Sequence, residues 1–149
     1  MRFLVVCSKV LLYIALTTLL LACANTTRSG AVGVNRSQFL AVSASEVDRL
    51  SAISYNDQNQ KAKEKNILIT SGPAYDRLKT ISTRLIAQTG VFRDDTQQWN
   101  WQLVLINAPI LNATCAPGGK ITFYTGLIEQ LNLTDDEIAA IMGHEIAHA

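Results

Sequence analysis

The feature that most constrains this chain is the run His144-Glu145-Ile146-Ala147-His148, in which two histidines stand four residues apart. On an α-helix, residues i and i+4 lie on the same face one turn apart, so both imidazoles can reach one metal ion. A carboxylate beside the first ligand can accept a proton from water. The spacing therefore predicts a helix that holds Zn²⁺ through His144 and His148, with Glu145 as general base.

The residues before this run have the signals of a helix start. Thr134 and Glu137 form the pattern of a capping box, and an apolar run follows it directly. Apolar residues then recur at helical spacing, at Ile138, Ile141, Met142 and Ile146. Small residues between them predict a helix that is buried among close neighbours: Ala139, Ala140, Gly143 and Ala147. The alternative is that both histidines are ordinary helix residues and Glu145 a polar neighbour; the capped apolar helix favours the metal site.

The N-terminus has the pattern of a targeting segment. Arg2 and Lys9 accompany an apolar run over residues 10–21, and Leu20-Leu21-Ala22-Cys23 resembles the bacterial lipobox. This resemblance implies a lipoprotein signal peptide over residues 1–22, acylation of Cys23, and a flexible tether over residues 23–38. Ala24, which is not Asp, implies an outer-membrane lipoprotein facing the periplasm of a bacterial envelope. The alternative is a plain secretory signal with an incidental cysteine.

Composition bounds the remaining classes of function. The length of 149 residues suits one domain, and a net charge of +1 without a basic stripe gives no indication of nucleic-acid binding. Once Cys7 leaves with the leader and Cys23 is acylated, Cys115 has no disulfide partner within the chain. It could be a ligand or a nucleophile, but a small buried hydrophobe fits better because no second cysteine lies nearby.

The rest of the chain predicts alternating helices and strands. Helices are expected over residues 43–65, over residues 73–90 with Pro73 in the first turn and Gly90 at the end, and over residues 126–131. Strands are expected over residues 99–106 and 120–124. Trp99 and Trp101 alternate with polar residues in the first strand; they could bind carbohydrate, but packing in the core or at an interface is favoured.

A second motif supports the first. The segment Asn112-Ala113-Thr114-Cys115-Ala116-Pro117-Gly118-Gly119-Lys120-Ile121, the pair Gly126-Leu127 and H-E-x-x-H occur in the order that resembles the M48 zinc metallopeptidases, the family of HtpX and the CAAX prenyl endopeptidases. The resemblance implies an α+β, zincin-like domain over residues 39–149, mostly helical with a small sheet beside the active-site helix. It also implies a third zinc ligand, a glutamate on a later helix beyond Ala149, so the C-terminal part of the domain is expected to be missing.

The resemblance implies a zinc-dependent endopeptidase that acts on unfolded, misfolded or damaged envelope proteins and is held at the membrane by its lipid anchor. The Pro117–Gly119 turn could present the next strand, with Lys120, Ile121, Thr122 and Phe123, as an edge to which a peptide adds. A simple turn into a core strand is the alternative. For the whole chain, the alternative is a chaperone-like binding lipoprotein without proteolysis, or an inactive truncated fragment.

Overall fold

The computed structural model describes residues 23–24, 38–39 and 42–149, which belong to two units, Met1–Ser43 and Ala44–Ala149. In the first unit, strands β1 (Cys23–Ala24) and β2 (Gln38–Phe39) pair antiparallel, with Cys23 opposite Phe39. The predicted signal peptide and most of the predicted tether lie outside the described residues, and acylation of Cys23 stays a prediction. No helix in the described part of the chain has both the length and the apolar character needed to cross a membrane.

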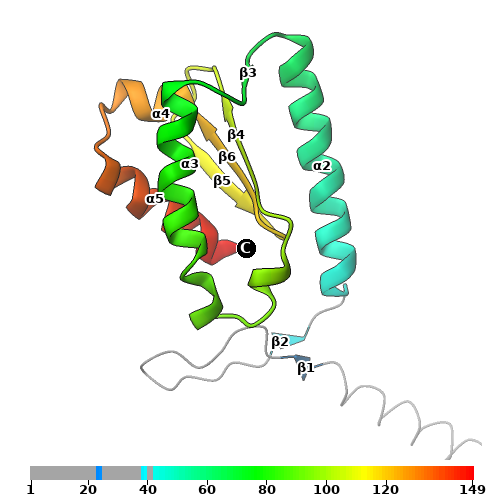
Figure 1. Ribbon diagram of the computed structural model, residues 1–149. Coiled ribbons are helices and arrows are strands. Elements are labelled where there is room, and N and C mark those ends of the chain that lie inside the picture. The colour runs from blue at the N-terminus through cyan, green and yellow to red at the C-terminus, as the bar shows by residue number, and fades with distance from the viewer. Residues whose placement is uncertain (1–22, 25–37, 40–41) are drawn as a thin grey trace, which may run out of the picture. The chain divides into compact units, whose positions relative to one another are not determined.

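The second unit contains helices on both faces of a four-stranded sheet (Figure 1). Its elements follow the chain in the order α2 (Ala44–Glu64), β3 (Leu68–Ile69), α3 (Pro73–Ile86), two 3₁₀ turns η1 (Thr89–Val91) and η2 (Thr96–Gln98), β4 (Gln102–Ile106), β5 (Ala113–Ala116), β6 (Lys120–Tyr124), α4 (Thr125–Gln130) and α5 (Asp135–His148). This architecture confirms the predicted α+β fold with a small sheet beside the helix that carries the two histidines.

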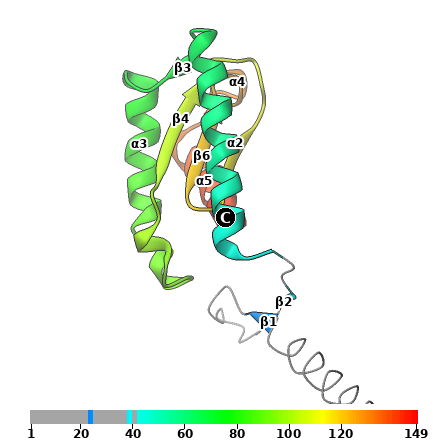
Figure 2. The same ribbon diagram turned by 90° about the vertical axis from the view of Figure 1, so that its right-hand side faces the viewer.

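The strand order is β3-β4-β6-β5, with β4 parallel to β6 and the outer two strands antiparallel to their neighbours. Because side chains alternate along a strand, the sheet has two distinct apolar faces. Leu105, Ile121 and Phe123 are fully buried on the face covered by α3 and α5. Val104 and Ile106 pack on the opposite face against Tyr55 and Ala62 of α2, and Figure 2 shows α2 and α3 on different sides of the sheet.

The turn between β5 and β6 contains two glycines with positive φ. Gly118 has φ 76° and Gly119 has φ 78°, a region that favours glycine. A Cβ atom on Gly119 would lie 2.6 Å from the Trp101 ring, so the backbone at this position can lie against the indole only because residue 119 has no side chain. The turn therefore joins β5 and β6 as an antiparallel hairpin, with Gly119 packed against the Trp101 ring.

Two predicted boundaries were wrong. The helix that starts at Pro73 ends at Ile86 and not at Gly90, which lies in η1; there the Thr89 hydroxyl donates to the Ile86 carbonyl. The strand predicted from Trp99 begins at Gln102. Trp99 instead ends η2, and the Trp101 indole donates to the Thr96 carbonyl at 2.8 Å. Trp101 also packs against the main core, which supports the packing role of this residue.

Candidate active site on helix α5

Helix α5 begins with the predicted capping box. The Thr134 hydroxyl accepts from the Glu137 backbone N–H at 3.4 Å, and the Glu137 carboxylate accepts from the Thr134 backbone N–H at 2.8 Å. These bonds satisfy donors that the first turn of a helix leaves without partners. The bond from the Thr134 backbone lowers the pKa of Glu137 below its ordinary value, so the carboxylate is charged where the helix dipole favours negative charge.

In the described part of the chain, helix α5 is buried on one face only, so the prediction of a helix buried among close neighbours holds for that face and was wrong for the outer one. Ile138 and Met142 are fully buried against β5 and α3, one turn apart. Ala140 and Ala147 are exposed, and a Cβ atom on Gly143 would meet no atom within 4 Å. Ala139 packs against the main core, but Ala140, Gly143 and Ala147 do not serve close packing between the described elements, and the outer face of α5 is accessible there.

The two histidines converge on that outer face. The Nε2 atoms of His144 and His148 lie 3.0 Å apart, and their rings meet edge to face with centroids 4.6 Å apart. Two nitrogens that bind one tetrahedral zinc at about 2.0–2.1 Å stand about 3.3 Å from each other. The observed pair is close to that separation, and both rings are exposed, so His144 and His148 fit a shared metal ion.

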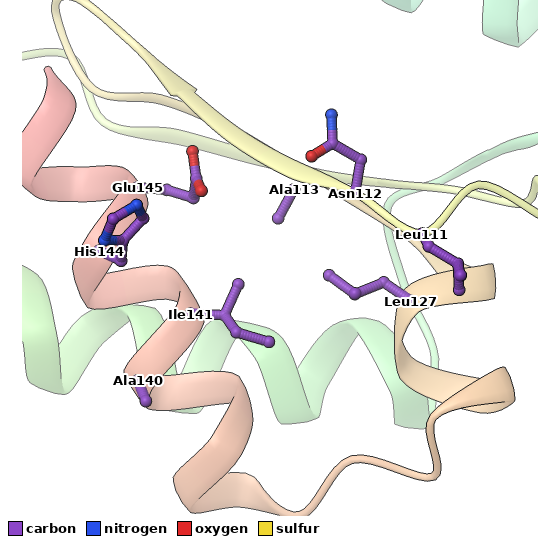
Figure 3. A pocket seen from close by; sticks show the side chains of 8 residues that line it. All are labelled: Leu111, Asn112, Ala113, Leu127, Ala140, Ile141, His144 and Glu145. Atoms are coloured by element: carbon purple, nitrogen blue, oxygen red, sulfur yellow. The ribbon is translucent and has the colours of Figure 1, made fainter.

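The carboxylate of Glu145 points from α5 toward β5, beside the first histidine (Figure 3). Glu145 is half-buried and lines an open pocket of about 430 Å³. The polar residues of this lining are Glu145, His144 and Asn112. The remainder of the lining is aliphatic and comes from three different elements and one loop: Leu111, Ala113, Leu127, Ala140 and Ile141.

Sequence reasoning missed this pocket. In Figure 3, Leu127 of α4 and Ile141 of α5 point into the hollow from different sides, and Ala113 points into it from β5. The signal for it in the sequence is weak. The pairs Gly126-Leu127 and Asn112-Ala113 belong to the motifs that resemble the family, but nothing in the sequence indicates that they line a common pocket. Gly126 lets α4 sit against the loop before β5, because a Cβ atom there would lie 2.6 Å from the Ile110 backbone nitrogen.

Cys115 faces the core and takes no part in the exposed site, as the sequence predicted. It is 7% exposed within the main apolar cluster. Burial raises the pKa of the Cys115 thiol to about 12, and the nearby negative charge of Glu145 adds to this shift. A thiol with that pKa stays protonated at neutral pH and is a poor nucleophile.

The third zinc ligand is not found in the part of the chain that the structure describes. Among those residues, no group of three histidine, cysteine, aspartate or glutamate side chains could hold a metal ion. Glu137 is committed to the helix cap, and Glu129 is exposed near the end of α4. The expectation that the third ligand follows Ala149 stays a prediction.

The assignment of Lys120, Ile121, Thr122 and Phe123 to an edge strand was wrong. Strand β6 pairs with β4 on one side and with β5 on the other, so its backbone cannot accept another strand. All four side chains are buried. The Lys120 ammonium donates to the carbonyls of Asn100 and Gly118, which ties the turn to the segment before β4. The strand at this end of the sheet is β5, next to α5.

The comparisons with known proteins agree with this geometry. Residues 74–149 match the family model described as peptidase family M48. The mitochondrial metalloendopeptidase OMA1 of Arabidopsis thaliana is 44% identical over 50 residues, which are 34% of this chain and 10% of the relative. The human mitochondrial metalloendopeptidase OMA1 is 28% identical over 115 residues, which are 76% of this chain and 21% of the relative. No solved structure matches the chain significantly.

These relatives overturn one prediction. The Schizosaccharomyces pombe relative, 27% identical over 76% of this chain and 32% of its own length, is also a mitochondrial metalloendopeptidase OMA1. Relatives from plant, animal and yeast mitochondria contradict the predicted localisation as a bacterial outer-membrane lipoprotein, which rested on the short segment around Cys23 alone. The chain spans about a fifth of the human relative's length. Because the family model covers half of the chain and includes both histidines of the motif, this chain belongs to peptidase family M48.

Proposed function

We propose that the chain carries part of the catalytic centre of a zinc-dependent endopeptidase. The observation that carries the proposal is the convergence of His144 and His148 on the exposed face of α5, with Glu145 beside them at the mouth of a pocket. Family membership and the relatives' names as metalloendopeptidases support the same reaction class.

In this proposal His144 and His148 supply two ligands through Nε2, and a carboxylate outside the described residues supplies the third. When bound, Zn²⁺ provides Lewis-acid chemistry: it polarises a carbonyl and makes water more acidic. The Glu145 carboxylate accepts a proton from the attacking water and delivers it to the amine that leaves. Its half-buried position next to His144 holds that carboxylate beside the metal-binding face.

Strand β5 ends the sheet among the described strands, and we propose its outer edge as the surface for the peptide backbone, in place of β6. A segment that adds to a strand edge uses main-chain hydrogen bonds, which carry little information about side chains. Such a segment must be extended and without partners of its own, a condition that unfolded and damaged proteins meet. We therefore propose unfolded, misfolded or damaged proteins as substrates, in a role in protein quality control.

The test is Glu145→Gln in the complete protein loaded with zinc. The variant should keep zinc at the wild-type stoichiometry and lose cleavage of an unfolded protein such as reduced casein, because Gln cannot accept the proton. Glu129→Gln is the matched control, since Glu129 is exposed on α4 and does not line the pocket. It should cleave at the wild-type rate.

Persistent zinc-dependent cleavage by Glu145→Gln would contradict the role of Glu145. If the wild-type protein binds zinc and unfolded protein but never cleaves it, the peptidase assignment is wrong and the chaperone-like alternative replaces it.

A further inference from the structure

Arg77 joins helix α3 to the start of α5, the helix that carries the two histidines. Its Nε atom donates to the Asp135 carboxylate at 2.5 Å, and its Nη2 atom donates to the Leu133 carbonyl at 2.8 Å. Leu133 and Asp135 stand directly before and after Thr134, the N-cap of α5. One guanidinium therefore holds both sides of the position at which α5 begins, where α5 lies beside α3 (Figure 1).

The segment that Arg77 binds is itself well fixed. Asn132 has a positive φ of 48°, and the Leu133 backbone N–H donates to the Ile128 carbonyl of α4 at 3.0 Å. The capping box of Thr134 closes the first turn of α5 from within. Because the loop is bonded to α4 at one end and to α5 at the other, the two bonds from Arg77 act on the position of the helix.

Apolar packing alone defines the position of α5 less sharply. Among the described residues, Ile138 and Met142 are the side chains of α5 that are fully buried, and apolar contacts have no preferred direction. A helix held by two such residues one turn apart can rotate or slide slightly with little loss of burial. Hydrogen bonds are directional, so two bonds from one planar guanidinium set both the rotation and the axial position of the first turn.

The position of α5 matters because the site uses groups from different elements. His144 and His148 share α5, so the distance of 3.0 Å between their Nε2 atoms does not depend on Arg77. A shift of the whole helix changes instead the distance from Glu145 to β5, and from both histidines to a ligand on another element. Catalytic groups must be held within about 0.5 Å of their productive geometry.

We propose that Arg77 is a positioning residue of the catalytic centre. It lies at the opposite end of α5 from the histidines and acts through Leu133 and Asp135 on the orientation of that helix. The inference rests on the proposed peptidase function and adds to it a residue of α3, outside the H-E-x-x-H motif.

The first experiment compares two arginines of α3 in the complete zinc-loaded protein. Arg77→Met should lower kcat for reduced casein about tenfold and leave KM close to the wild type, because the peptide edge on β5 is unchanged. Arg84→Met is the matched control, since Arg84 is exposed in the last turn of the same helix. Arg77→Lys should lie between the wild type and Arg77→Met, because an ammonium lacks the planar fork of donors. Equal kcat in Arg77→Met and Arg84→Met would overturn the proposal.

Stability separates positioning from a merely structural role. The side chains of Arg77 and Asp135 are 36% and 69% exposed, and exposed ion pairs contribute little to stability. The urea midpoint of Arg77→Met should therefore stay near that of the wild type while kcat falls. A loss of activity that only follows the loss of folded protein would overturn the positioning role.

Two neighbouring aspartates test the partner of Arg77. Asp135→Asn and Asp136→Asn each remove one negative charge from the first turn of α5, and both residues are exposed, but the guanidinium binds Asp135. Asp135→Asn should lower kcat, and adding it to Arg77→Met should lower kcat little further, because the two residues form one interaction. Equal losses from the two asparagine variants would assign the effect to helix charge and contradict the proposal.

Methyl NMR separates failure of the positioning role from failure of the peptidase assignment, because it needs neither zinc nor turnover. Met142 and Ile146 pack against the main core near the histidines. Their signals should move in Arg77→Met and Asp135→Asn and stay fixed in Arg84→Met and Asp136→Asn. If the complete protein cleaves nothing yet the signals move in this pattern, the proposed function is wrong and the positioning role stands. If they stay fixed in all four variants, the positioning role is wrong whether or not the protein cleaves.

Discussion

The Nε2 atoms of His144 and His148 lie 3.0 Å apart across one turn of α5, with both imidazoles exposed. The backbone geometry of the helix alone produces this convergence, because residues i and i+4 project from the same face. The two rings need little rearrangement to face one ion, which lowers the ordering cost of binding a metal.

The first prediction concerns metal affinity. His148→Ala in the complete protein should weaken Zn²⁺ binding by more than the roughly 10- to 100-fold that loss of an outer-shell partner costs, because it removes a ligand outright. Competition with a chromophoric chelator measures the change. Glu145→Gln serves as the control and should keep zinc affinity within about tenfold of the wild type. Equal zinc affinity of wild type and His148→Ala would mean that the metal site lies elsewhere.

The cap of α5 gives a prediction about stability. Thr134→Ala removes the hydroxyl that accepts from the Glu137 backbone N–H and should lower the free energy of unfolding by about 1 kcal/mol. Thr83→Ala on α3 is the control: the Thr83 hydroxyl bonds to the Lys79 carbonyl within the helix, where alanine is the better helix former. Urea titrations of the three proteins give the comparison, and a larger loss from Thr83→Ala would contradict it.

The same cap should make the stability of the protein depend on pH. The Thr134 backbone N–H lowers the pKa of Glu137 in the folded protein below its ordinary value of 4.5. A carboxyl with a depressed folded pKa contributes stability above its unfolded pKa and loses it as the pH falls through the folded pKa. The stability difference between wild type and Glu137→Gln should therefore be largest at neutral pH and shrink below about pH 4.5. A difference that grows on acidification would have the wrong sign.

Local signals made much of α5 and its surroundings predictable. The capping box, the histidine spacing and the Pro-Gly-Gly turn each act within a few residues, so sequence alone locates α5, the turn at Gly118 and Gly119, and strand β6. Cys115 could be placed in the core because a lone cysteine without a charged partner behaves as a small hydrophobe.

The features that could not be predicted from the sequence depend on contacts between segments far apart in the chain. Strands β3 and β5 have two and four residues, too few for a clear periodic pattern, and pairing with other strands defines them. The parallel pairing of β4 with β6 places β5 outside β6, which is why the edge was assigned to the wrong strand. Leu111, Leu127 and Ile141 form a pocket only after a loop, α4 and α5 come together.

The turn before β6 tests how glycine shapes the sheet. Gly119→Ala should destabilise the fold by roughly 2–5 kcal/mol, because the new Cβ atom combines a positive φ with a 2.6 Å contact to Trp101. Gly72→Ala isolates the backbone contribution: Gly72 has φ 97° but a Cβ atom there meets nothing within 4 Å. That variant should lose only about 1–2 kcal/mol in urea unfolding. Equal losses would show that contact with Trp101 costs nothing.

The last prediction separates Cys115 from the catalytic centre. Its thiol is buried and its pKa is raised to about 12, so the thiolate forms only far above neutral pH and a thiol reagent at pH 8 should react with Cys115 only after unfolding. Cys115→Ala should keep zinc stoichiometry and cleavage close to the wild type while losing some stability, because it removes a core atom. Labelling in native buffer and in urea, with mass spectrometry of the peptide that contains Cys115, measures the first part. Fast labelling in native buffer, or loss of zinc from Cys115→Ala, would place this sulfur within reach of the metal-binding face and contradict its assignment to the core.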